Sequence, residues 1–120
     1  RRKCPPALLD AACRSMVELS AAGRDAMVAV GANAATDVTG FGLAGHAMEL
    51  AEGSNVTVVL RLSALPLLAG IDRLDVTRHC TRASGTNGDY TAAATRFDGP
   101  ADPFRLEFLY DAQTSGGLLI

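Results

Sequence analysis

The feature that most constrains this chain is a segment, residues 37–46, in which three glycines follow one another at close spacing. Gly40, Gly42 and Gly45 stand at the spacing of a dinucleotide-binding fingerprint. That fingerprint needs an apolar strand before it and an acidic residue about 20 positions later, but small residues precede this segment and Leu65 stands near the acidic position. The segment instead predicts a helix start at which Gly42 and Gly45 let the helix pack closely against a sheet. Binding of an anion by the exposed N–H groups of that helix start is the alternative interpretation.

Asp37 is the candidate functional residue, because it is a lone carboxylate just before this helix start. Two interpretations stay open from the residues alone. Asp37 caps the helix, or it is a ligand of Mg²⁺, which commonly takes one or two carboxylates together with phosphate oxygens. Thr39 is a further candidate for the helix N-cap. His46 lies among apolar residues, and we expect it to be hydrogen-bonded and structural rather than catalytic.

Other residues of catalytic type carry weaker signals. Residues 114–117 (Thr-Ser-Gly-Gly) lack the spacing of a serine nucleophile elbow, so we expect a tight turn with a positive φ at Gly116 or Gly117. Three cysteines are too few for a disulfide framework, which indicates a reducing, cytosolic compartment. The adjacent pair His79 and Cys80 lacks zinc-ligand spacing, so we expect neither metal binding nor thiol catalysis there.

Hydrophobic periodicity gives a coarse map of the chain. It predicts an amphipathic helical segment over residues 6–30, which Gly23 bends or divides and Gly31 ends, and a second helix over about 39–53. A strand over 56–62, a short helix over 71–76 and mostly loop over 77–103 follow. The last part is predicted as an alternating, strand-like segment over 104–110, a polar loop over 111–117 and a strand that begins at Leu118.

Length and charge limit the classes of function. The 120 residues suffice for one domain. Eleven basic and 13 acidic residues give a net charge of −2, so no polyanion-binding field and no nucleic-acid partner are expected. No apolar run approaches the roughly 18 residues of a membrane span, so no membrane partner is expected. The chain begins without Met and ends on an apolar run, and we therefore expect a piece of a longer protein.

Three segments together resemble one enzyme family. Residues 36–46, 65–70 and 111–119 are similar, in sequence, order and approximate spacing, to the C-terminal half of selenophosphate synthetases. Related enzymes of the same superfamily, such as aminoimidazole ribonucleotide synthetase and thiamine-phosphate kinase, carry different residues after the turn in the first segment. Residues 84–89 depart from the family pattern, since they lack its Arg-Asn pair, and Tyr110 stands where the family often has Cys.

The resemblance implies an α/β (α+β) fold, the C-terminal domain of the aminoimidazole ribonucleotide synthetase-like superfamily, with a mixed sheet packed with helices. Residues 1–120 would be a single, truncated C-terminal domain, and the N-terminal ATP-binding domain would be absent from this chain. It also implies a homodimeric, cytoplasmic enzyme that makes selenophosphate, AMP and phosphate from ATP, selenide and water, for selenocysteine and selenouridine synthesis.

The resemblance also assigns one residue a role. Family members bind their Mg²⁺ ions through three Asp carboxylates in all, and one of these corresponds to Asp37. No catalytic residue and no confident ATP contact falls in this chain, so we expect it to be inactive alone. Two alternatives remain: another ATP-dependent enzyme of the superfamily, or a non-catalytic homologue that serves dimerisation or partner binding.

Overall fold

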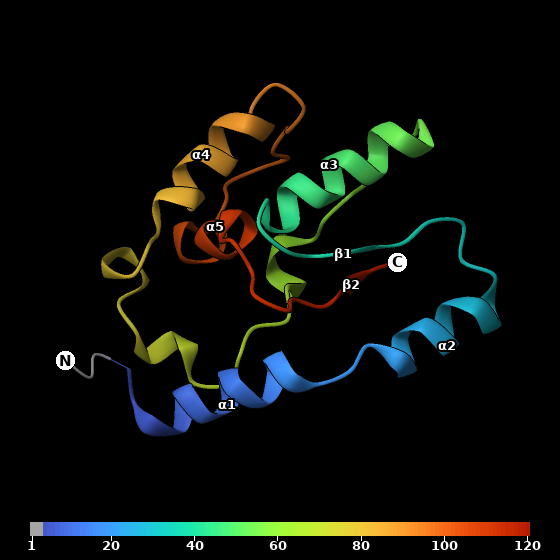
Figure 1. The fold of residues 1–120 in the computed structure, drawn as a ribbon. Helices are drawn as coiled ribbons and strands as arrows, with labels where there is room; N and C mark the ends of the chain where they lie inside the picture. Colours follow the sequence, from blue (N-terminus) through green and yellow to red (C-terminus); the bar gives the residue numbers. More distant parts are fainter. Residues whose placement is uncertain (1–3) are drawn as a thin grey trace.

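The computed structural model describes residues 4–120, which form helices around a small two-stranded sheet (Figure 1). Helices are α, and short 3₁₀ turns are labelled η. The elements in chain order are α1 (Pro6–Val17), α2 (Ala21–Val30), β1 (Thr36–Asp37), α3 (Gly42–Ser54), η1 (Leu62–Ala64), η2 (Ile71–Arg73), η3 (Val76–Arg78), α4 (Arg82–Thr91), α5 (Pro103–Tyr110) and β2 (Leu118–Leu119). Within the described residues, no helix is long and apolar enough to cross a membrane.

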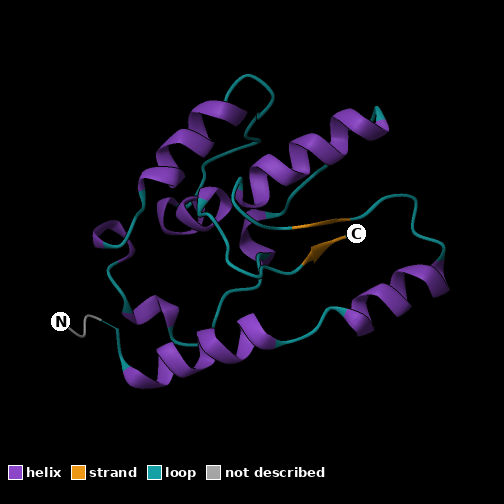
Figure 2. Cartoon of the chain, viewed as in Figure 1, coloured by secondary structure: helices purple, strands orange, loops and turns teal. Residues whose placement is uncertain are grey.

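The sheet joins two distant parts of the chain. Strands β1 and β2 pair antiparallel, with Thr36 opposite Leu119 and Asp37 opposite Leu118. Figure 2 shows the two strands side by side, with β2 at the C-terminus of the chain. The predicted strand at Leu118 and the α/β (α+β) class are therefore confirmed, although the sheet among the described residues has only two strands.

The core lies where α3, α4 and α5 pack against one another. The buried side chains at this junction are mostly small or polar: Ala44 and Ala47 from α3, Ser84, Asn87 and Thr91 from α4, and Leu109 from α5. Small side chains let the three helix axes approach closely, so the junction depends on fit and hydrogen bonds as well as on apolar area.

The N-terminal region forms two helices within the one predicted segment. Helix α1 ends at Val17 because Glu18 is extended, with φ −68° and ψ 128°, and α2 begins after Ser20 rather than bending at Gly23. Gly31 ends α2 with φ 66°, as predicted, since glycine adopts the left-handed conformation without strain. The apolar faces of both helices stay largely open: Val17 is 75% exposed and Val30 is 79% exposed.

The predicted strand over residues 56–62 is wrong. After the left-handed C-cap Asn55 of α3, the chain runs to η1 without entering a sheet. A strand needs a neighbouring strand for its backbone hydrogen bonds, and the sheet of the described residues contains only β1 and β2. The alternating apolar residues are partly in solvent as a result, and Val56 is 55% exposed.

Helix α5 replaces the strand-like segment predicted over residues 104–110. The Asp102 side chain accepts a hydrogen bond of 3.0 Å from the Phe104 backbone N–H, and Pro103 occupies the first turn. An N-capping Asp followed by Pro is a strong helix start signal. The Phe104 and Phe108 rings, one turn apart, then lie 5.1 Å from centroid to centroid.

Helix α4 lies in the region predicted to be mostly loop. Its buried positions, Ser84, Asn87 and Thr91, follow helical spacing, but all three side chains are polar. Because hydrophobic periodicity marks only apolar faces, this polar face gives no helical signal in the sequence. The short helix predicted over 71–76 is present as two separate 3₁₀ turns, η2 and η3.

Candidate functional site

Asp37 lies in strand β1, with its side chain exposed. No hydrogen bond or ion pair engages its carboxylate within residues 4–120; only its backbone oxygen accepts a bond, of 3.1 Å, from the Thr36 hydroxyl. Helix α3 begins five residues later with Phe41 as its N-cap and without a side-chain capping bond. The capping interpretations of Asp37 and Thr39 are therefore wrong, because the chain makes an extra turn between β1 and α3.

The segment that carries Asp37 is held along one side by the C-terminal loop. The Val38 N–H donates to the Gly117 carbonyl at 3.0 Å, and the Gln113 N–H donates to the Thr39 carbonyl at 3.0 Å. Val38 itself is buried, at 7% exposed. Together with the pairing of Asp37 and Leu118, these bonds fix the backbone on which the free carboxylate stands.

Glycines permit the close contacts around this segment. Gly42 has φ +68°, and a Cβ there would lie 2.9 Å from the Tyr110 carbonyl carbon and oxygen. A Cβ at Gly45 would lie 2.5 Å from the Phe41 Cβ. Close packing is confirmed at Gly42, although it packs against the end of α5 and not against a sheet as predicted, whereas Gly45 makes room for Phe41 at the start of its own helix.

The glycine pair of the C-terminal loop acts in another way than predicted. The positive φ, 50°, belongs to Ser115, and neither Gly116 nor Gly117 has a positive φ. A Cβ at Gly116 would instead overlap the Val38 carbonyl oxygen. Close approach of two backbones, and not left-handed geometry, therefore requires glycine at position 116.

His46 is buried and hydrogen-bonded, as expected. Its Nε2 lies 3.1 Å from the Thr39 hydroxyl and its Nδ1 lies 3.3 Å from a Glu49 carboxylate oxygen. The contact with Thr39 ties helix α3 back to the turn that precedes it.

Asn87 is a residue of this site that the sequence did not reveal. It is 5% exposed, and its side-chain nitrogen donates to the Gly40 carbonyl at 2.9 Å and to the Tyr110 carbonyl at 2.9 Å. It lies in residues 84–89, where the chain departs from the family pattern, and an Asn among polar neighbours carries no pattern that marks it as buried.

The comparison with protein families decides the classification. The family described as AIR synthase related protein, C-terminal domain, matches residues 11–119. The chain belongs to this family. The family assignment agrees with the superfamily expected from the three segments.

Relatives of this AIR synthase related domain include several named selenide, water dikinase. One from Geobacter metallireducens is 41% identical over 115 residues, which cover 96% of this chain and 33% of the relative. Those from Burkholderia ambifaria and Trichlorobacter lovleyi are 40% and 43% identical over 103 residues, 86% and 85% of this chain and 29% of each relative. The chain thus spans about a third of the length of the relatives it matches.

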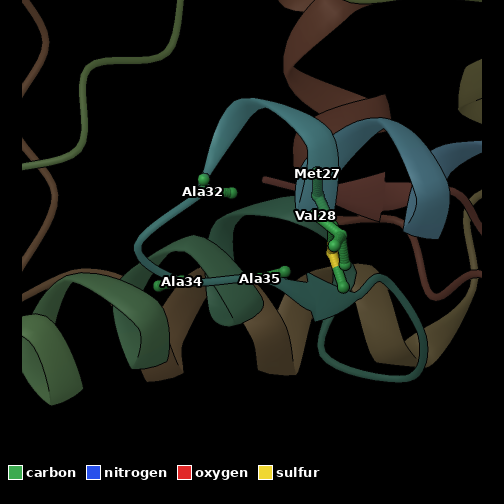
Figure 3. Close-up of a pocket in the computed structure, with 6 residues that line it drawn as sticks. Met27, Val28, Ala32, Ala34 and Ala35 are labelled. Carbon is green, nitrogen blue, oxygen red and sulfur yellow. The ribbon is translucent and has the colours of Figure 1, made fainter.

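Two hollows on this AIR synthase related domain lie away from the Asp37 carboxylate. One, of about 260 Å³, is lined only by Gly31 and by the apolar side chains of Met27, Val28, Ala32, Ala34 and Ala35 (Figure 3). The other, of about 1310 Å³, is an open groove between α3, residues 55–63 and residues 94–102. The first has no charged group to hold a nucleotide, and neither is lined by Asp37.

A complete metal site does not form within residues 4–120, where no three His, Cys, Asp or Glu side chains come together. Asp37 nevertheless fits a divalent cation as one ligand, because its carboxylate is ionisable, exposed and not engaged by another group. Since Mg²⁺ takes only one or two carboxylates and completes its shell with phosphate oxygens and water, one carboxylate is a useful share of such a site.

Two further side chains, Asp111 and Cys80, have shifted pKa values. Burial raises the pKa of Asp111, and the nearby Glu107 carboxylate adds to the rise, while the Gln113 amide, which donates to Asp111 at 3.2 Å, acts in the opposite direction. The Cys80 thiol donates to Glu107 at 2.9 Å, and this bond raises the pKa of Cys80. A raised pKa keeps the thiol protonated, whereas nucleophilic cysteines need a lowered pKa.

Proposed function

We propose that this chain is the C-terminal domain of a selenide, water dikinase, and that it contributes Asp37 as one ligand of a shared Mg–ATP site. The proposal is supported by the relative of that name that is 41% identical over 96% of this chain. The structural observation that carries it is the Asp37 carboxylate, exposed and unengaged on a backbone fixed by the C-terminal loop.

The proposed reaction consumes ATP, selenide and water and gives selenophosphate, AMP and phosphate. Bound Mg²⁺ offsets the negative charge of the transferring phosphoryl group. Asp37 supplies a negatively charged oxygen ligand, and the bonds of Val38 and Thr39 to the C-terminal loop hold it in place. A fixed ligand matters because Mg²⁺ demands near-octahedral geometry at about 2.0–2.1 Å.

The rest of the proposed site lies outside this chain. The resemblance to selenophosphate synthetases implies that the other two Asp carboxylates, a nucleophilic Cys or selenocysteine, an essential Lys and most ATP contacts belong to an N-terminal domain of the longer protein. We further propose that this protein is a cytoplasmic homodimer. Residues 1–120 then act as a structural and metal-binding domain, inactive without their N-terminal partner.

Replacement of Asp37 by Asn in the longer protein tests the proposal. The amide keeps the size of the side chain but removes the charge that faces the cation. We expect a higher half-saturating Mg²⁺ concentration and slower selenide-dependent ATP turnover, with the free energy of unfolding changed by no more than about 0.5 kcal/mol, as for other surface replacements. Asp98→Asn, at another exposed Asp, is the matched control.

An unchanged Mg²⁺ requirement in Asp37→Asn, with full turnover at limiting Mg²⁺, would refute the metal role. Mg²⁺-dependent ATP turnover that does not respond to selenide would refute the acceptor and favour another enzyme of the superfamily. Both measurements use the same purified variants.

A further inference from the structure

We infer that Asn87 is a positioning residue for Asp37, and this inference rests on the metal role proposed above for that carboxylate. Asn87 stands on α4, and within residues 4–120 its side chain forms no hydrogen bond with the carboxylate or with strand β1. It acts through the turn between β1 and α3, by holding the Gly40 carbonyl three residues beyond Asp37.

The geometry of the Asn87 amide is that of a clamp between three elements. Its nitrogen donates to the Gly40 carbonyl and to the Tyr110 carbonyl, both at 2.9 Å. A primary amide carries two hydrogens on one nitrogen, so one side chain from α4 joins the turn before α3 to the end of α5. Neither a single hydroxyl nor an apolar side chain supplies both donors at one point.

The Gly40 carbonyl depends on this clamp. No backbone N–H in residues 4–120 donates to it, whereas the neighbouring Thr39 carbonyl accepts from both Gly42 and Gln113. Asn87 is 5% exposed, so little water can reach its amide to replace the bond. Gly40 itself is exposed, so water can pair with its carbonyl when the amide is lost, but water does not tie the turn to α4, and the turn is then free to shift.

The two sides of the Asp37 segment are therefore held by different parts of the chain. The C-terminal loop binds Val38 and Thr39 on one side, and α4 binds Gly40 on the other through Asn87. Gly42, two residues after Gly40, packs against the Tyr110 backbone at the end of α5. A shift of the turn moves the strand that carries Asp37. The expected effect is weaker binding of the cation, with little change in the turnover rate once the cation is bound.

The test measures the Mg²⁺ requirement of the longer protein in two ways: as the dissociation constant of Mg²⁺ by calorimetry in the presence of a non-hydrolysable ATP analogue, and as the half-saturating Mg²⁺ concentration for ATP turnover. We expect Asn87→Ala to raise it about 10-fold, the lower end of the range for residues that orient metal ligands, with turnover largely recovered at saturating Mg²⁺. Asn87→Ser, which keeps one donor, should give a smaller rise and serves also if the Ala variant does not fold. Asn87→Ala combined with Asp37→Asn should raise the constant no further than Asp37→Asn alone.

Thr91→Val is the matched control. Thr91 is fully buried on the same helix, but its hydroxyl donates only to carbonyls of α4, those of Asn87 and Gly88. The control should lower the melting temperature and leave the Mg²⁺ requirement unchanged, so a merely structural effect of α4 is told apart from positioning.

The outcomes separate the inference from the proposed function. If Asp37→Asn raises the Mg²⁺ requirement and both Asn87 variants leave it unchanged, the positioning role is wrong and the metal role stands. If Asp37→Asn itself has no effect, the metal role fails and the positioning role fails with it. An additive effect in the double variant also overturns the inference, because Asn87 would then act by a route other than Asp37.

Discussion

Gly116 is the position where one added methyl group should damage the fold most directly. A Cβ there would overlap the Val38 carbonyl oxygen and lie 3.0 Å from the Gln113 Cβ and 3.1 Å from the Val38 carbonyl carbon. No rotamer relieves this clash, since the backbone fixes the Cβ. The two backbone segments must separate, which strains the hydrogen bonds from the Val38 N–H to the Gly117 carbonyl and from the Gln113 N–H to the Thr39 carbonyl. Two hydrogen bonds at about 1 kcal/mol each and overpacking of about 1–3 kcal/mol give a loss of about 3–5 kcal/mol.

Urea unfolding followed by circular dichroism measures this loss for Gly116→Ala, and Gly117→Ala is the adjacent control. A Cβ at Gly117 meets no atom within 4 Å and its φ is not positive. Replacement there should be neutral or stabilise by about 0.4–1 kcal/mol, through the lower entropy of the unfolded chain. Equal free energies of unfolding for the two variants would refute the close approach of the C-terminal loop to Val38.

Two further predictions concern the raised pKa values of Asp111 and Cys80. The raised pKa of Asp111 means that the folded chain holds this proton more tightly than the unfolded chain. The free energy of unfolding therefore falls as the pH rises from the usual Asp range through the raised pKa. Asp111→Asn should therefore gain more stability over the wild type at about pH 7 than at about pH 3 in urea unfolding; an equal gain at both would contradict it. Glu107→Gln removes the carboxylate that raises the pKa of Cys80, so Cys80 should alkylate faster by peptide mass spectrometry. The rate at Cys13 is the internal reference, and an unchanged ratio would argue against the contact.

Sequence patterns predicted the local structure correctly where a single residue determines the backbone conformation. The stop at Gly31 followed from its left-handed conformation alone. The alternation of apolar residues over 104–110 predicted a strand, but a helix forms. The N-cap Asp102 and Pro103 in the first turn outweigh the spacing of the apolar residues in a segment of only two helical turns. The prediction of a strand over residues 56–62 is wrong for another reason. An alternating pattern favours extended backbone, but a strand forms only beside a partner strand, and the pattern does not show whether a partner is present.

The candidate site shows where prediction from sequence must stop. Asp37 was identified from its neighbours, but its setting depends on residues near the other end of the chain, since β1 pairs with β2. The contacts that fix it also fall where side-chain patterns are silent: Gly42 and Gly116 matter because they lack a Cβ, and Asn87 acts through a buried amide in a polar stretch. A carboxylate binds a cation well only if its backbone cannot drift. The Asp37 backbone is therefore fixed by glycines, which allow close contacts, and by hydrogen bonds to main-chain groups. Both kinds of contact can be identified only when the distant segments are placed together in the structure.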